Sequence, residues 1–316
     1  MGHHTGSDQM PNEPHQLRIG IIGGSGLGRA LTSGFEDDVT DFVEHDLTTP
    51  FGKPSAPIIT AQYRDVPIAV LPRHGIGHTL LPAKVPYRAN IFALKSLGCT
   101  HIIASGATGS LREEIEPGDL VLVDQLIDRT DGRPRTFYEN AAVHVEFAEP
   151  VCPLMQHWLQ EAAKRLEDVT VHDRGVYICM EGPSFSTRAE SMLHRQWGGD
   201  LIGMTALPEA RLAREAEMAY ALIALPTDYD CWRERPESQT QMSLIEEIIS
   251  NLNTAVANSI ALIQTALDDV SSLREQPSPA HDALALAIWT DKSLISCDEV
   301  KRLEPLWGRH FMQAAK

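Results

Sequence analysis

The sequence predicts an α/β protein in which helices flank a largely parallel β-sheet. Short apolar runs rich in β-branched residues alternate with stretches of helical periodicity, and no repeat or low-complexity linker interrupts them before about Ser271. This alternation is typical of layered sheets, because each connecting helix covers a face of the sheet. We expect one domain over residues 17–270, a disordered leader (1–16), and a C-terminal loop and helix (271–316) packed on the same domain.

Each expected strand is a short apolar run, and each expected helix shows an apolar period of about 3.6 residues. The strands are Leu17–Ile22, Val66–Leu71, His101–Ser105, Leu120–Val123, Val176–Met180 and Ala221–Leu225. The helices are Tyr87–Leu97, Pro153–Leu166, Thr187–Trp197, Glu209–Met218 and the long amphipathic Met242–Leu267. After the polar, loop-like segment Ser271–Ala280, we expect a final helix near Cys297–Ala314.

Composition excludes several classes of function. The 316-residue chain has a formal charge of −16, which repels DNA and RNA, so we expect no nucleic-acid partner. No apolar run approaches the roughly 20 residues of a membrane helix, and residues 1–16 lack the apolar core of a signal peptide. Five widely spaced cysteines without a C-x-x-C pair argue against disulfides and a zinc knuckle. We expect a cytoplasmic protein with no membrane partner and no bound metal.

Three segments at the carboxyl ends of expected strands could bind an anion. Gly23–Gly28 offers backbone N–H groups, although Arg29 stands where a dinucleotide-binding loop needs its third glycine. Arg73 and His74 supply a planar fork of donors and an imidazole, and the segment Ser105–Ser110 is built of small residues. Taken alone, Gly23–Gly28 could be a tight turn between a strand and a helix, Arg73 and His74 a solvent-exposed pair, and Ser105–Ser110 a connecting loop. Because ligands of open α/β sheets bind beyond the carboxyl ends of strands, we expect one shared anion site.

Polar and aromatic residues after three other apolar runs could bind a base and a sugar. Phe185, within Glu181–Glu190, stands between small polar residues, where it could stack on a base or simply pack in the core. Thr205 could donate its hydroxyl to phosphate. Asp228 and Asp230 could bracket an amine and a ring nitrogen, unless they only cap a loop.

Together these motifs resemble the 5′-methylthioadenosine phosphorylases of the trimeric purine nucleoside phosphorylase family. The resemblance runs from about Leu17 to about Leu267 and is most specific in Ile19–Leu27, Thr49–Pro54, Gly98–Asp124, Gln125–Tyr138, Glu181–Glu190 and Thr227–Trp232. It implies a nucleoside phosphorylase-like fold, a single-domain mixed β-sheet flanked by helices, assembled as a homotrimer. It also implies phosphorolysis of 5′-methylthioadenosine to adenine and 5-methylthioribose 1-phosphate, with inorganic phosphate as co-substrate and no cofactor.

The resemblance further implies roles for residues whose motifs match. The phosphate ligands would be Ser25, Arg73, His74, Gly106, Ala107 and Thr205. The nucleoside ligands would be Met204, Phe185, Ser186, Asp228, Asp230 and, from a neighbouring subunit, His144. Asp228 would be catalytic, as a general acid that protonates or strongly hydrogen-bonds N7 of the leaving base. A carboxylate accepts hydrogen bonds from an exocyclic amine and repels a 6-oxo group, so we expect 6-aminopurines as substrates.

The chain departs from the family pattern at four places. This chain has Ser25 where the family more often has threonine, and Ser184 where it usually has arginine. Its small-residue segment reads SGATG in place of TTACG, and Gln241 falls near positions that usually form an apolar wall for the methylthio group. The last departure leaves open a purine nucleoside phosphorylase that acts on adenosine, inosine or 5′-methylthioinosine. A nucleosidase using water would leave the Arg73–His74 pair without a function, and a binding-only protein would release no base.

Overall fold

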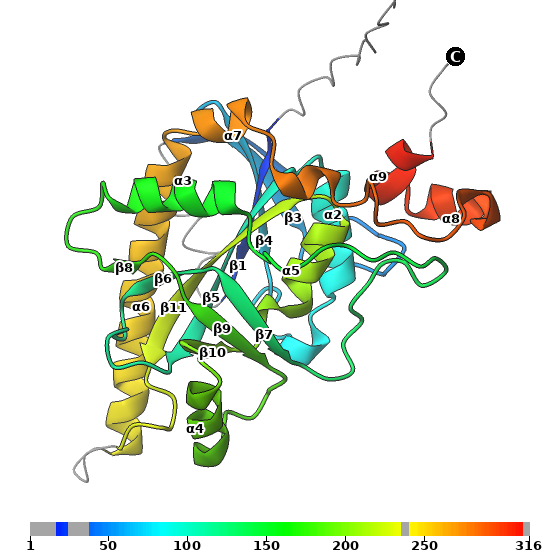
Figure 1. The fold of residues 1–316 in the computed structure, drawn as a ribbon. Helices are drawn as coiled ribbons and strands as arrows, with labels where there is room; N and C mark the ends of the chain where they lie inside the picture. Colours follow the sequence, from blue (N-terminus) through cyan, green and yellow to red (C-terminus); the bar gives the residue numbers. More distant parts are fainter. Residues whose placement is uncertain (1–16, 25–37, 235–239, 312–316) are drawn as a thin grey trace, which may run out of the picture.

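The computed structural model describes residues 17–24, 38–234 and 240–311 (Figure 1). Its strands are β1 Ile19–Gly23, β2 Val39–His45, β3 Ile58–Tyr63, β4 Val66–Pro72, β5 His101–Ser110, β6 Leu120–Val123, β7 Gln125–Arg129, β8 Val171–His172, β9 Val176–Met180, β10 Leu201–Gly203 and β11 Ala219–Asp228. Its α-helices are α2 Tyr87–Ser96, α3 Pro153–Ala163, α4 Arg188–Gln196, α5 Ala206–Glu215, α6 Gln241–Leu267, α7 Ser271–Glu275, α8 Cys297–Arg302 and α9 Glu304–Trp307. The described residues also form the short 3-10 helices η1 Pro82–Lys84, η2 Pro279–Asp282, η3 Lys292–Leu294 and η4 Gly308–His310.

The described strands form one mixed sheet, which confirms the predicted fold class. Its order is β2-β3-β4-β1-β5-β10-β9-β7, while β11 pairs with β5 and β6, and β6 also pairs with β8. The centre is parallel, because β4, β1, β5 and β11 run in the same direction. Antiparallel pairs occur at β2-β3-β4, at β5-β10 and at β6-β11. The parallel centre brings the carboxyl ends of β1, β4, β5 and β11 to one edge of the sheet.

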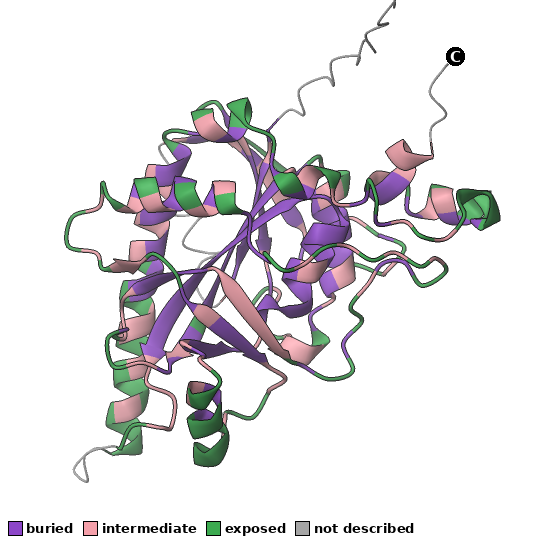
Figure 2. Cartoon of the chain, in the orientation of Figure 1, coloured by how far each residue is buried: buried purple, intermediate pink, exposed green. Residues whose placement is uncertain are grey.

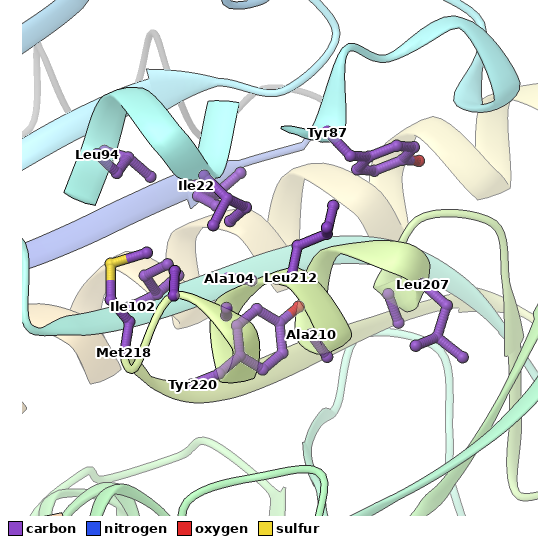
Figure 3. Packing of buried hydrophobic residues seen from close by; sticks show 14 of the residues in the cluster. Ile22, Tyr87, Leu94, Ile102, Ala104, Leu207, Ala210, Leu212, Met218 and Tyr220 are labelled. Atoms are coloured by element: carbon purple, nitrogen blue, oxygen red, sulfur yellow. The ribbon is translucent and has the colours of Figure 1, made fainter. Parts of the chain in front are cut away.

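The central strands are buried on both faces (Figure 2). Alternate side chains of a strand point to opposite faces, and β11 shows this clearly. Tyr220, labelled in Figure 3, joins the cluster beneath α2 and α5 together with Leu222, whereas Ala221 and Ile223 join the cluster beneath α3 and α6. Because a strand buried on both faces has apolar residues at successive positions, β11 could be predicted from its sequence.

Every predicted strand and helix of residues 17–267 is present, but the segment Ser105–Ser110 is not a loop. It continues β5, because β11 pairs with β5 as far as Gly109, and β10 pairs with its last two residues. Strands β2, β3, β7, β8 and β10 were not predicted from the sequence; β2 and β7 end the strand order, and β8 and β10 have only two and three residues. None of the described helices is long and apolar enough to cross a membrane.

The C-terminal tail differs from its prediction in two ways. The expected loop Ser271–Ala280 contains α7 and the start of η2, and the expected final helix is divided into α8, α9 and η4. Pro305, which has no N–H to donate, stands at the start of α9 and prevents α8 from continuing. The tail joins the core through Trp307, whose ring centroid lies 4.7 Å from that of Tyr138.

Candidate functional site

A cleft of about 300 Å³ opens at the carboxyl ends of β4, β5 and β11. Its lining comes from Gly24, Arg73, His74, His78, Pro82, Gly106, Ala107, Thr108, Gly109, Met180, Phe185, Ile202, Gly203, Met204, Thr205, Thr227, Asp228, Asp230, Ile248 and Leu252. Arg73 and Asp228, predicted for opposite ends of one ligand, therefore line the same cleft. Of the predicted phosphate and nucleoside ligands, most are brought together here.

Arg73 is the fully buried cation of the cleft. Its Nε and Nη2 donate to the carboxylate of Glu209 at 2.7 and 2.9 Å, and its Nη1 donates to the Ser105 carbonyl at 2.7 Å. Burial alone would lower the pKa of Arg73, but the Glu209 carboxylate outweighs burial and raises it. The guanidinium is thus permanently charged and held in one orientation, as a fixed anion site requires. The sequence analysis did not identify Glu209, because nothing in its helical pattern marks a buried carboxylate.

Two glycines leave room beside this guanidinium. A Cβ at Gly24 would lie 3.3 Å from Arg73 Nη1 and 3.1 Å from the Ser105 carbonyl oxygen. A Cβ at Gly106 would lie 3.7 Å from Nη1 and 3.5 Å from Thr205 Oγ1. A side chain at position 24 would therefore be crowded, whereas a Cβ at position 106 would lie at ordinary van der Waals distances. The absence of side chains lets an anion reach Nη1 between the two backbones.

His74 is neutral in this environment. Its Nδ1 lies 2.8 Å from the Leu80 carbonyl, and its ring stacks on His78 with centroids 4.3 Å apart. Burial lowers the pKa of His74 to about 4, and the nearby Arg73 adds to this effect. A carbonyl only accepts hydrogen bonds, so Nδ1 carries the proton and Nε2 is an acceptor. The neutral ring therefore offers an acceptor that suits a protonated oxygen of phosphate.

Two carboxylates, those of Asp228 and Asp230, also line the cleft. Asp228, the last residue of β11, accepts hydrogen bonds from the Asp230 N–H at 2.7 Å and from Thr227 Oγ1 at 2.8 Å. Asp230 Oδ2 is buried and has no hydrogen-bond partner within the described residues. The Thr108 hydroxyl beside them is equally buried and unpartnered there. Buried polar atoms without partners are costly, so both atoms indicate a polar ligand. Thr108 was overlooked because the prediction treated its segment as backbone alone.

Arg133, which is also buried, organises the segment that carries Met204. Its guanidinium donates to the carbonyls of Met204 at 2.7 Å, Leu207 at 2.8 Å and Glu181 at 2.7 Å. The Glu181 carboxylate accepts a fourth hydrogen bond at 2.9 Å. One side chain thus joins the loop after β9 to the turn before α5. This role was not predicted, although Arg133 lies within the Gln125–Tyr138 stretch that supports the resemblance.

The remaining wall of the cleft is apolar. Ile248 and Leu252 of α6 line it together with Met180 and the exposed Phe185. Gln241 does not line the cleft; it begins α6, about two helical turns before Ile248. The polar residue at position 241 therefore leaves this wall intact.

Three predicted ligands stand apart from this set. Ser25 lies outside the described residues. Ser186 is not a lining residue, but its hydroxyl lies 3.7 Å from the sulfur of Met180, which is one. His144 is exposed and does not line the cleft of its own chain. Its backbone N–H donates to the Ala287 carbonyl at 2.9 Å, and its ring centroid lies 4.8 Å from that of Trp289. The described residues contain no cluster of three or more His, Cys, Asp or Glu suited to a metal ion.

Comparison with known proteins agrees with this geometry. The family model described as phosphorylase superfamily matches residues 18–268. An S-methyl-5′-thioadenosine phosphorylase of Thermosynechococcus vestitus is 46% identical over 93% of this chain and 99% of its own length. The enzyme of the same name from Geobacter sulfurreducens is 47% identical over 92% of this chain and 98% of its own length.

Solved structures give the same result. A methylthioadenosine phosphorylase sourced from an Antarctic soil metagenomic library superposes with a TM-score of 0.79 at 40% identity, covering 92% of this chain and 99% of that one. The Schistosoma mansoni methylthioadenosine phosphorylase in complex with adenine gives 0.75 at 35% identity, covering 86% and 99%. With sequence, fold and cleft in agreement, the chain belongs to the phosphorylase superfamily, among relatives that are S-methyl-5′-thioadenosine phosphorylases.

Proposed function

We propose that this protein cleaves 5′-methylthioadenosine with inorganic phosphate, giving adenine and 5-methylthioribose 1-phosphate. The observation that carries the proposal is that the Arg73 guanidinium and the Asp228 carboxylate line one cleft. The relatives from Thermosynechococcus vestitus and Geobacter sulfurreducens are S-methyl-5′-thioadenosine phosphorylases, which supports the same reaction.

Phosphate occupies the end of the cleft beside Arg73, His74, Gly106, Ala107 and Thr205. From there one of its oxygens attacks C1′ of the sugar, while its charge stabilises the cationic sugar that develops as the glycosidic bond breaks. The new C1′–O bond forms as the electron pair of the C1′–N9 bond leaves with the base. Because the guanidinium is already fixed by Glu209, little reorganisation is needed as charge develops.

Adenine occupies the other end, between Phe185 and the two aspartates. Asp228 delivers a proton or a strong hydrogen bond to N7, which takes up the negative charge of the leaving base. Asp230, whose Oδ2 has no partner in the described residues, accepts from the 6-amino group. In the free protein each carboxylate oxygen of Asp228 accepts one hydrogen bond, and these bonds orient the side chain.

The apolar wall of Ile248 and Leu252 faces the 5′ group, which favours a methylthio substituent over a hydroxyl. We further propose a homotrimer in which His144 of one subunit covers the 5′ group bound by its neighbour. Its exposed position away from its own cleft supports this arrangement. The odd number of free cysteines fits a cytoplasmic enzyme.

A kinetic comparison of 5′-methylthioadenosine, adenosine and 5′-methylthioinosine, with and without phosphate, tests the proposal. We expect phosphate-dependent release of adenine, fastest from 5′-methylthioadenosine. Faster release of hypoxanthine than of adenine would establish the alternative, a 6-oxopurine nucleoside phosphorylase. Release that does not depend on phosphate would establish a nucleosidase.

A further inference from the structure

A second cavity, of about 530 Å³, lies at the other end of the parallel strands. Arg18 and Thr100, which directly precede β1 and β5, contribute to its lining, as does Pro67 near the start of β4. The C-terminal tail closes the cavity through His281 of η2 and through residues of α9 and η4. None of the residues assigned to phosphorolysis lines it, so the cleft does not account for this cavity.

The charge inside this cavity is opposite in sign to that of the whole chain. Three cations line it, namely Arg18, Lys95 and Arg309, although the chain carries a net charge of −16. Of the two carboxylates in the lining, Glu217 is already paired with Arg309 at 2.8 Å, and Glu304 is exposed. Arg18 and Lys95 therefore remain as positive charge that no carboxylate of the lining neutralises at close range.

Lys95 stands out among these cations. It lies in the last turn of α2, and within the described part of the chain its ammonium group has no hydrogen bond or ion pair. Burial lowers the pKa of Lys95 to about 8, with Glu217 partly offsetting that effect. The side chain is half-buried in the cavity wall, and partial removal from water disfavours a charged group that has no partner. An anion bound in the cavity would pair with the ammonium group and remove this unfavourable free energy. The unpartnered Lys95 therefore favours anion binding.

We propose that this cavity binds a small organic anion, a carboxylate or phosphate monoester of metabolite size, with Lys95 as its main charge partner. The volume falls within the range of about 300–1,000 Å³ that is typical of small-molecule sites. The site is independent of the catalytic cleft, and a ligand there would connect the tail to the start of the central strands. Carboxylate and phosphate share the chemistry that Lys95 and Arg18 recognise.

Calorimetric titration of the full chain with citrate and, separately, with glycerol 3-phosphate tests the site. The titrations are run without inorganic phosphate, which would compete for the site, and the Lys95→Met variant separates binding here from binding beside Arg73. We expect one of the two probes to bind with one site per chain, which also identifies the class of anion. In Lys95→Met the affinity should fall at least tenfold while phosphorolysis is unchanged. The matched control Lys164→Met, at an exposed lysine paired with Glu161, should bind normally. Failure of both probes, or equal binding by Lys95→Met, would overturn the proposal.

Labelling with pyridoxal 5′-phosphate provides a second measurement that does not depend on the natural ligand. The neutral amine of Lys95 attacks the aldehyde carbon of the probe, water leaves, and added borohydride reduces the imine to a stable secondary amine. Peptide mass mapping should show Lys95 labelled before Lys164, with suppression by whichever anion binds in the titration. Labelling of Lys95 no faster than Lys164 contradicts an anion site at Lys95.

Discussion

Arg73 and Glu209 form a bidentate ion pair in the interior, with Arg73 Nε and Nη2 at 2.7 and 2.9 Å from the two carboxylate oxygens. Each side chain is only 1% exposed. The Tyr220 hydroxyl donates to the same carboxylate at 2.9 Å. Glu209 therefore determines how Arg73 faces the cleft, although Glu209 itself does not line it.

Replacing Glu209 with Gln should raise the KM for phosphate at least tenfold and affect the KM for nucleoside much less. Gln keeps the shape but removes the charge that fixes Arg73, so the free energy of unfolding should also fall by about 3 kcal/mol. Steady-state kinetics with each substrate varied, together with urea unfolding, measures both effects. Glu161→Gln, in an exposed pair with Lys164, is the matched control and should change neither. An unchanged KM for phosphate in Glu209→Gln would show that Arg73 needs no positioning.

Replacing Asp228 with Asn should reduce kcat for 5′-methylthioadenosine by roughly 10²–10⁴, the usual contribution of a general acid. The amide still forms hydrogen bonds but cannot supply a proton to N7. Because an amide no longer repels a 6-oxo group, activity on 5′-methylthioinosine should fall less. Asp65→Asn, at an exposed ion pair with Arg274, controls for loss of a carboxylate elsewhere. Normal turnover of 5′-methylthioadenosine by Asp228→Asn would rule out the proposed role.

Thr108→Val should separate ligand binding from folding. The hydroxyl has no partner in the described part of the free protein, so its removal should leave the Tm unchanged or raise it. If the hydroxyl binds substrate, the KM for nucleoside should rise about five- to tenfold, the value of a hydrogen bond of about 1 kcal/mol. Ser259→Ala removes another buried, unpartnered hydroxyl, outside the cleft, and should alter no kinetic constant. A lower Tm with unchanged KM would make Thr108 purely structural.

Acid should destabilise the protein in part through His101. This side chain is buried with its ring 5.0 Å from that of His281, and burial lowers the pKa of His101 from 6.5 to about 3. Below about pH 6.5 the His101 imidazole is protonated in the unfolded chain but stays neutral in the folded chain. The free energy of unfolding therefore falls as the pH falls towards 3. Between these two pKa values, this one group lowers the free energy of unfolding by up to about 1.4 kcal/mol for each unit by which the pH falls.

Urea unfolding at several values between about pH 7 and pH 5 should show a shallower loss of stability in His101→Gln than in the wild type. The exposed His157→Gln should follow the wild type. Parallel curves for all three proteins would mean that His101 takes up a proton in the folded state.

How well each element could be predicted depended on its burial. Strands such as β1 and β11 are enclosed on both faces and read as unbroken apolar runs. By contrast, β2 has exposed residues along most of its length, and β10 has only three residues, so neither gives an apolar pattern. In the tail, proline interrupts the short helices. These helices pack against residues distant in sequence, such as Tyr138, and the local sequence gives no sign of such contacts.

Within the site, predictions worked where chemistry is concentrated in short motifs. Arg73 and Asp228 follow or end apolar strands, so their convergence could be inferred from strand direction alone. Glu209 and Arg133 act through partners 136 and 71 positions away in sequence, Arg73 and Met204. Such pairings depend on how helices and loops fold over the sheet, and periodicity carries no information on them.

The continuation of β5 through Ser110 limits how this cleft can change during evolution. Gly106, Ala107 and Thr108 are fixed in register by β11, and Gly109 by both β11 and β10. Inserting or deleting one residue there would turn each following side chain to the opposite face. At these positions of β5, substrate preference therefore changes by exchange of side chains at constant length, and each exchange can be made singly in the laboratory.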